Sequence, residues 1–278
     1  MGSDPIIFVI LLAIPHELYP MDSDPALAVR SVKGQVTAEE WAVRTDLAAA
    51  YRLVAKYGWD DLVFTHLSAR VPGLDHHFLI NPYGMMFGEI TASSLVKVDL
   101  EARKVMESPF EINPAGFTIH SAVHEAREDA LCVMHLHTID GVAVSCQEGG
   151  LLPISQQSLF PLSNLSYHAY EGLALNPEEK KRLVRDLGGN HFMILRNHGL
   201  LTCAATVADA FLDMYILQKA CEVQVRAQTG GGKLIAVAKP IVDGIQAQAK
   251  VVMRQSGGMI AWPGLLRMLD REQAGWRA

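Results

Sequence analysis

Hydrophobic positions recur with a helical period in several long segments of the chain. One segment begins at Thr37, a capping residue with Glu40 three positions later, and stops at Gly58, which predicts a capped helix over 37–57. The longest segment runs from Val207 to Gln228 and is closed by glycines at 230–232. Shorter helical segments are predicted at 117–127, 139–146, 178–187, 245–254 and 265–271.

Shorter runs between these helices are typical of strands. Residues 62–71 alternate between apolar and polar side chains and meet Pro72-Gly73, and residues 77–80 run into the turn sequence Asn81-Pro82-Tyr83-Gly84. Because helices and strands interleave along the chain, the pattern favours a sheet covered by helices over a bundle or a β-sandwich. Further buried strands are predicted at 131–136, 192–195 and 200–203.

The composition is that of a globular protein and excludes some classes of partner. Of the 278 residues, 50% are hydrophobic and 19% are charged, which is far from the composition of a disordered chain. The net charge is −6 and no dense run of Lys or Arg is present, so we expect no nucleic-acid partner. The four cysteines stand apart in apolar segments, which predicts reduced, buried thiols in a cytoplasmic protein: Cys132, Cys146, Cys203 and Cys221.

An apolar run near the N-terminus raises the question of a targeting segment. The run, residues 6–14, is too short to span a bilayer, which takes about 20 residues. Asp4 precedes it and Pro15 ends it, whereas a signal peptide has basic residues before its apolar region and a small-residue cleavage site after it. We therefore expect no membrane association. Because Met21 resembles a natural start, residues 1–20 are interpreted as a leader or a non-native extension.

Two histidines occur in the sequence Val133-Met-His-Leu-His-Thr, where a buried strand would favour Val or Ile. Residues two apart in a strand point to the same side, so His135 and His137 present their imidazoles together. A third imidazole can come from His198, in a strand-breaking turn where Gly199 lets the backbone reverse. Three imidazoles suit Zn, Mn, Fe or Co and leave coordination positions open for a substrate. Paired strand histidines are also common as structural residues, so the pair alone does not establish a metal site.

The histidine motifs belong to a longer series in which the chain resembles the class II aldolase/adducin family, over roughly residues 37–228. The series includes Gly58-Trp-Asp-Asp, Thr65-His-Leu-Ser-Ala-Arg, Asn81-Pro-Tyr-Gly, Asn113-Pro-Ala-Gly-Phe, Leu151-Leu-Pro-Ile-Ser, Tyr167-His-Ala-Tyr-Glu-Gly, Arg196-Asn-His-Gly and Ala220-Cys-Glu-Val-Gln. The resemblance implies a three-layer α/β/α sandwich with a central mixed β-sheet, commonly a homotetramer with active sites between subunits. It divides the chain into an N-terminal extension (1–36), the family domain (37–228) and a C-terminal extension (229–278) that packs on the domain or on a neighbouring subunit.

The resemblance also implies a metal centre and a reaction type. In the aldolases of the family, histidines at the positions of His135, His137 and His198 bind a divalent metal, usually zinc, which polarises the carbonyl of a keto sugar phosphate. This chain departs from that pattern, because Gly116 stands where the aldolases carry their acid/base glutamate, and phosphate-binding residues are replaced in three loops. We therefore expect a small, carboxylated substrate without phosphate.

Other polar residues near these motifs are candidates for substrate binding and proton transfer. Arg70 can clamp a carboxylate with its planar fork, and Tyr83 can lie against a flat ring. His66 and His168 can supply the proton that a carbanion needs after decarboxylation. Three of these residues have a structural alternative: His66 can cap a turn, Arg70 can form a surface ion pair, and Tyr83 can pack in a loop.

Three functions therefore stay open. The first is a metal-dependent carbon-carbon lyase, either a decarboxylase or an aldolase, with zinc preferred and Mn or Fe(II) as alternatives. The second is a non-haem Fe(II) oxygenase on the same scaffold, because three imidazoles also hold iron. The third is a non-catalytic module, because the head domain of the cytoskeletal adducins belongs to the same family. His120 and His124, one helical turn apart, are left unassigned.

Overall fold

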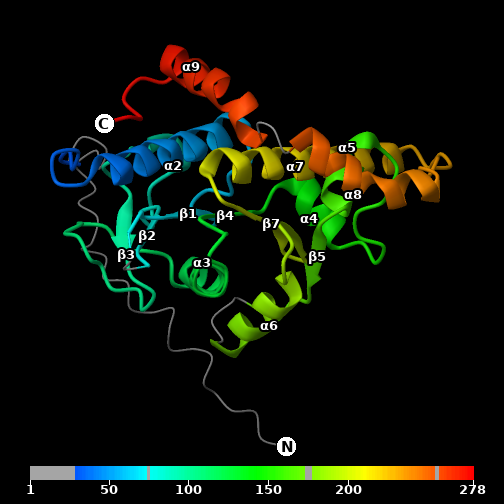
Figure 1. Cartoon of the computed structure of the whole chain (residues 1–278), viewed down its shortest axis with the longest axis horizontal. Helices are drawn as coiled ribbons and strands as arrows, with labels where there is room; N and C mark the ends of the chain where they lie inside the picture. The colour runs from blue at the N-terminus through cyan, green and yellow to red at the C-terminus, as the bar shows by residue number, and fades with distance from the viewer. Residues whose placement is uncertain (1–28, 74–75, 173–176, 254–256) are drawn as a thin grey trace, which may run out of the picture.

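A computed structural model describes residues 29–73, 76–172, 177–253 and 257–278 of the chain (Figure 1). Within these residues the strands form one seven-stranded sheet in the order β3-β2-β1-β4-β7-β6-β5. All neighbouring strands are antiparallel except β5 and β6, so the sheet is mixed. The strands are β1 (His66–Arg70), β2 (Phe78–Ile80), β3 (Val96–Val98), β4 (Cys132–Leu136), β5 (Leu165–His168), β6 (Phe192–Leu195) and β7 (Gly199–Ala204).

Helices cover both faces of this sheet (Figure 1). On one face lie α2 (Ala38–Lys56) and α7 (Val207–Thr229), and two short helices pack against α7: α4 (Ile139–Ser145) and α5 (Gln156–Leu162). On the other face lie α3 (Pro114–Ala126) and α6 (Pro177–Leu187), which pack against each other. The predicted three-layer α/β/α sandwich around a mixed sheet is therefore confirmed.

Each face of the sheet has its own apolar core, because the strands are buried on both sides. Met134 and Leu136 of β4 belong to the core under α2 and α7. Val133, which precedes Met134, belongs to the core under α3 and α6, together with Ile119 and Leu201. His135 follows this alternation and therefore lies on the α3 and α6 face, at the end of the apolar row.

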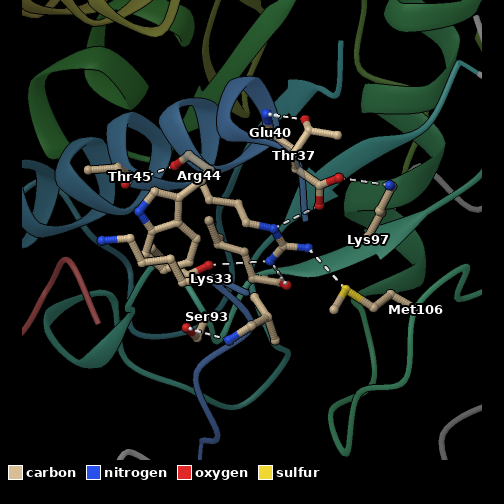
Figure 2. A network of polar contacts seen from close by, with 12 residues as sticks. Lys33, Thr37, Glu40, Arg44, Thr45, Ser93, Lys97 and Met106 are labelled. Atoms are coloured by element: carbon tan, nitrogen blue, oxygen red, sulfur yellow. Dashed lines mark hydrogen bonds and ion pairs between the residues drawn. The ribbon is translucent and has the colours of Figure 1, made fainter. Parts of the chain in front are cut away.

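Helix α2 begins and ends where the sequence predicts. The side chain of Thr37 accepts a hydrogen bond from the backbone N–H of Glu40 at 3.1 Å, and Tyr57 is the C-terminal cap. The Glu40 carboxylate does not complete a capping box. It accepts instead from Arg44 Nε and Lys97 Nζ, both at 2.9 Å, deep beside β3 (Figure 2).

The buried Arg44 guanidinium joins α2 to the segment before β3 (Figure 2). Its Nη1 donates to the carbonyl oxygens of Ala92 at 3.3 Å and Leu95 at 2.9 Å, and its Nη2 lies 3.6 Å from Met106 Sδ. Burial lowers the pKa of Arg44, while the hydrogen bond and charge of Glu40 raise it. A desolvated cation with these partners holds the helix against the sheet.

The structure extends or corrects several predicted elements. The strand predicted over 62–71 is only β1, because Leu62 adopts a positive φ of 49° in a turn before it. Three elements were not predicted: β3 and β5 are short and partly polar, and α5 contains an internal proline. Among the described residues there are also two short 3₁₀ helices that were not predicted, η2 (Phe87–Glu89) and η3 (Gly257–Ile260).

The C-terminal extension contains two helices, α8 (Lys239–Met253) and α9 (Trp262–Glu272), both longer than predicted. Trp262, Leu269 and Trp276 are buried in the core cluster shared with α2 and α7. The indole Nε1 of Trp262 donates to Asp46 Oδ1 of α2 at 3.0 Å. The extension therefore packs on this chain's own helices.

The structure tests only in part the expectations that all four cysteines are buried and that the chain does not associate with a membrane. Cys132, Cys203 and Cys221 are buried free thiols as predicted, but Cys146, at the end of α4, is exposed. Among the described residues, no helix is long and apolar enough to cross a membrane. The apolar run 6–14 lies outside the described residues.

Candidate metal centre

The three predicted histidines meet at one end of the sheet. His135 is the fourth residue of β4, His137 follows that strand, and His198 lies in the turn between β6 and β7. The antiparallel register brings β4 and β7 together, with His135 opposite Leu201. The turn before β7 therefore returns to the point where β4 ends, so residues about 60 positions apart become neighbours.

The three rings face one another closely. The Nε2 atoms of His135 and His137 are 3.0 Å apart, and the ring centroid of His198 lies 4.7 Å from that of His135 and 4.8 Å from that of His137. One nitrogen from each ring can be chosen so that all three lie within 4.8 Å of one another. His135 is buried and the other two are half-buried, so the cluster is open on one side.

Hydrogen bonds fix the tautomers of the two strand histidines. His135 Nδ1 lies 3.0 Å from the carbonyl oxygen of Leu200, which can only accept, so Nδ1 carries the hydrogen. His137 Nδ1 likewise donates to Asp61 Oδ2 at 2.9 Å. With Nδ1 carrying the hydrogen in each ring, both Nε2 atoms are available to hold a cation placed between them. Carbonyl and carboxylate partners on the second ring nitrogen are the usual support of metal-binding histidines.

The separation and protonation of these nitrogens also fit a metal. Zinc binds imidazole nitrogen at roughly 2.0–2.1 Å in a tetrahedral arrangement, which places two such nitrogens about 3.3 Å apart. Burial lowers the pKa of His135 well below its ordinary value, and burial with the charge of His137 lowers the pKa of His198 to about 4. Neutral imidazoles at physiological pH are the form that binds a metal.

In the turn that carries His198, the left-handed residue is Asn197 and not, as the sequence predicts, Gly199. Asn197 takes the left-handed conformation, with φ of 56°, and Asn tolerates it better than most residues. Gly199 is needed for close packing instead, because a Cβ there would lie 2.5 Å from the carbonyl oxygen of Leu136 and 3.1 Å from His137 Cδ2. Gly199 therefore lets β7 approach β4 closely enough for the histidines to meet.

His66 occupies the space that a side chain at position 116 would need. His66 lies opposite His135 in the sheet register, and the two ring centroids are 5.6 Å apart. A Cβ at Gly116 would lie 2.4 Å from Cδ2 and 2.6 Å from Nε2 of His66. The buried imidazole thus stands at the position where the family resemblance places a glutamate. Burial, with the charges of His137 and His198, lowers the pKa of His66 to about 3.

A chain of hydrogen bonds lies beneath His66, on residues that the sequence left unassigned. His124 Nδ1 donates to the carbonyl oxygen of Ala130 at 3.0 Å, so its Nε2 accepts from the Ser68 hydroxyl at 2.7 Å. Ser68 Oγ in turn accepts from His120 Nδ1 at 2.5 Å, which leaves a lone pair on His120 Nε2. The rings of His120 and His66 are in edge-to-face contact at 5.3 Å. One carbonyl group therefore determines the tautomer of His120.

Arg70 and Tyr83 lie in different surroundings. Arg70 donates to Glu128 Oε2 at 2.7 Å and to the carbonyl oxygen of His124, and at four residues beyond His66 it lies about 13 Å along the strand. Its role as a carboxylate clamp stays a prediction, and this geometry gives it no support. Tyr83 follows β2 at the end of the sheet where β1 begins, because Ser68 pairs with Ile80 in that register. That position is compatible with a role near the histidines.

His168 lies at the same end of the sheet, on the other side of His198. It ends β5 opposite Leu195 of β6, on the face covered by α6. His168 Nδ1 donates to Asp186 Oδ2 at 2.8 Å, and its Nε2 lies 3.7 Å from Glu179 Oε1. Sequence reasoning gave no role to Asp61, Glu179 and Asp186. Asp61 lies in the motif Gly58-Trp-Asp-Asp, but nothing in the local sequence of the three residues marks them as partners of distant histidines.

Comparisons with known proteins show the family to which the chain belongs. The family model described as "Class II Aldolase and Adducin N-terminal domain" matches residues 45–225. A protein of Pseudomonas aeruginosa named "Putative aldolase class 2 protein" is 63% identical over 249 residues, which cover 88% of this chain and 96% of that protein. Alpha-adducin of Mus musculus is 44% identical over 196 residues, which cover 69% of this chain and 26% of adducin.

Two solved structures extend the comparison to the fold. The crystal structure of an aldolase II superfamily protein from Pseudomonas syringae has a TM-score of 0.86 at 47% identity, covering 90% of this chain and 100% of that chain. An L-fuculose 1-phosphate aldolase from Glaciozyma antarctica PI12 has a TM-score of 0.72 at 27% identity, covering 90% and 98% of the two chains. These matches confirm the resemblance inferred from the motifs.

Proposed function

The chain belongs to the class II aldolase and adducin family, and from this premise we propose that it is a divalent-metal-dependent carbon-carbon lyase. The proposed substrate is a small carboxylate without phosphate, and the proposed reactions are decarboxylation or aldol cleavage. One observation carries the proposal: hydrogen-bonded tautomers direct the Nε2 lone pairs of His135 and His137 toward each other at 3.0 Å, with His198 beside them.

His135, His137 and His198 would hold the metal, with zinc preferred and Mn or Fe(II) as alternatives. A bound divalent metal would supply Lewis-acid polarisation of a substrate oxygen next to the bond that breaks. The protein's own residues would do the rest. The Leu200 carbonyl group and the Asp61 carboxylate orient two of the rings.

The surroundings of His66 support a substrate other than a sugar phosphate. The imidazole fills the space at Gly116, so the chain has no room for the glutamate of the sugar phosphate aldolases. Decarboxylation needs no base to remove a substrate hydroxyl proton, but it needs a group that returns a proton to carbon. We propose His168 for that task and Tyr83 for contact with a planar substrate. The shared position of these two residues at one end of the sheet supports the assignment. The same role for His66 stays a prediction, because its lowered pKa leaves the imidazole uncharged near neutral pH.

Two other functions make different predictions. The same three imidazoles suit Fe(II), so an oxygenase is the alternative enzyme. The 44% identity to alpha-adducin favours a non-catalytic interaction module as the second alternative. We further propose that the protein is a homotetramer, as the family resemblance implies, and that it is cytoplasmic, as the spacing of its cysteines indicates.

The test is a titration of the purified, chelator-treated protein with Zn, Mn and, anaerobically, Fe(II), while a panel of mono- and dihydroxybenzoates is screened for carbon dioxide release. The lyase proposal predicts binding of one ion per chain, metal-dependent release of carbon dioxide, and loss of both in His135→Ala. His76→Ala is the control, because that histidine is exposed and lies outside the cluster. Oxygen uptake with iron would establish the oxygenase, and metal binding without turnover of any substrate would favour the interaction module.

A further inference from the structure

A second cluster of titratable side chains lies beside His198, on α6 and β5. Its members are His168, Glu179 and Asp186. The exposed fractions of His168 and Glu179 are 3% and 6%, so both residues are almost completely buried. His168 Nδ1 donates to Asp186 Oδ2 at 2.8 Å, and His168 Nε2 lies 3.7 Å from Glu179 Oε1. The carboxylates therefore flank the two nitrogens of one buried imidazole.

Two polar atoms of this cluster have no hydrogen-bond partner among the described residues. They are His168 Nε2 and Glu179 Oε2, and both are fully removed from solvent. A buried polar atom without a partner is costly, so such atoms call for a ligand, a water molecule or a functional role. The distance of 3.7 Å between the imidazole and the carboxylate is too long for a hydrogen bond but leaves them in ionic contact.

The unpartnered atoms belong to residues that line a small cavity. Its volume is about 10 Å³, which is enough for about one water molecule. His198, a proposed metal ligand, lines the same cavity, together with Tyr170 and with Ile119 of α3. The cavity therefore connects the acidic cluster to the edge of the metal centre.

The charges of the cluster allow one mobile proton. The Asp186 carboxylate orients His168 with its hydrogen on Nδ1, and the hydrogen bonds from His168 and Arg185 lower the pKa of Asp186 against the opposing effect of burial. Burial raises the pKa of Glu179, while the charge of His168 lowers it. A proton can therefore lie on Glu179 or on His168 Nε2 without changing the net charge of −1 on the three groups.

The other charged groups near this pair are engaged elsewhere. Arg182 forms an ion pair with Glu171, and Arg185 pairs with Asp186. Lys180 donates to Ser121 of α3 at 2.8 Å. No cation among the described residues donates a hydrogen bond to Glu179, and His168 is its one ion-pair partner there. The charges of Arg182 and Glu171 also act on the Glu179 carboxyl group, in opposite directions.

We propose that Glu179 and His168 form the proton-donating pair of the lyase, with Asp186 as a positioning residue, and that Glu179 replaces the carboxyl group missing at Gly116. This inference rests on the proposed function. It also assigns Glu179, from a different helix, to a role that the family pattern places at the start of α3.

The proton balance of the step is complete without a further reactant. When the bond to the carboxylate carbon breaks, carbon dioxide leaves and the electron pair stays on the substrate carbon. The proton held by Glu179 and His168 then crosses the small cavity, directly or through one water molecule, and forms the new C–H bond. The pair regains one proton from solvent, so each turnover consumes one proton.

The matched variants are Glu179→Gln and Glu178→Gln, adjacent glutamates of which the second is exposed and paired with Lys181. We expect Glu179→Gln to lower kcat for carbon dioxide release by about 10²- to 10⁴-fold, the range typical of general acid catalysis, with KM and zinc affinity little changed. Glu178→Gln should behave as wild type. Formate should restore part of the rate to Glu179→Ala, because a small acid fits the space left by the side chain.

The outcomes separate this inference from the proposed function. A wild-type protein that releases no carbon dioxide with any metal refutes the lyase itself. An active wild type with an equally active Glu179→Gln refutes only the proton-donating pair. If Glu179→Gln does not fold, as judged by its Tm, Asp186→Asn decides: a fall in kcat at unchanged KM supports the pair, and wild-type kcat overturns it.

Discussion

The contact between Gly116 and His66 gives a prediction that needs no knowledge of the substrate. A Cβ at position 116 would lie 2.4 Å from His66 Cδ2, whereas ordinary contact begins at 3.4 Å, so the ring must move by about 1 Å in Gly116→Ala. His66 is 3% exposed and touches the rings of His120 and His135, so it has little room to move. Forcing extra atoms into such a site typically costs about 1–3 kcal/mol.

The same substitution should become favourable once the ring is removed. Alanine is preferred over glycine inside a helix by about 0.5–1 kcal/mol, and residue 116 lies in the first turn of α3. We therefore expect Gly116→Ala to lower the free energy of unfolding in wild type by up to about 2 kcal/mol. In a His66→Ala background it should raise that free energy by about 0.5–1 kcal/mol.

The assay is a double-mutant cycle from urea unfolding at 25 °C, with a chelator present so that metal affinity does not contribute. Gly244→Ala in α8 is the control, because a Cβ there would have only the end of the Gln248 side chain nearby, at 4.0 Å. It should stabilise both backgrounds equally. If Gly116→Ala also has the same effect in both backgrounds, His66 does not occupy the space at residue 116 and the reasoning is refuted.

Three further predictions concern other parts of the molecule. Asp61→Ala removes the acceptor that orients His137 and should weaken zinc binding by about 10- to 100-fold in a competition titration. Arg44→Met leaves the buried Glu40 carboxylate with Lys97 alone and should lower the free energy of unfolding by about 3 kcal/mol, measured with urea. Burial and the charge of Asp209 raise the pKa of Asp213 to about 8. From pH 4 to 8 the folded protein therefore keeps a proton that the unfolded chain has released. The free energy of unfolding falls as the pH rises through this range. Asp213→Asn should therefore raise Tm more at pH 8 than at pH 5, and an equal change at both values would contradict this interpretation.

The main helices and strands could be predicted because their signals are local. Thr37 and Gly58 mark the ends of α2, and the apolar run before His135 marks β4, since capping and periodicity depend on residues a few positions apart. The short strands β3 and β5 lacked such a signal. Their three or four residues become strands only because a neighbouring strand supplies hydrogen bonds.

The sequence by itself determined that His135 and His137 share one side of a strand, and the family motif added His198. Only the tertiary structure decided what surrounds them: Asp61 on His137, His66 in the space of Gly116, and Glu179 beside His168. These pairs join residues between 11 and 76 positions apart, since sheet register and helix packing bring them together. The alternation of a strand is set by its own backbone geometry, whereas the partner of a buried side chain depends on how all the elements pack.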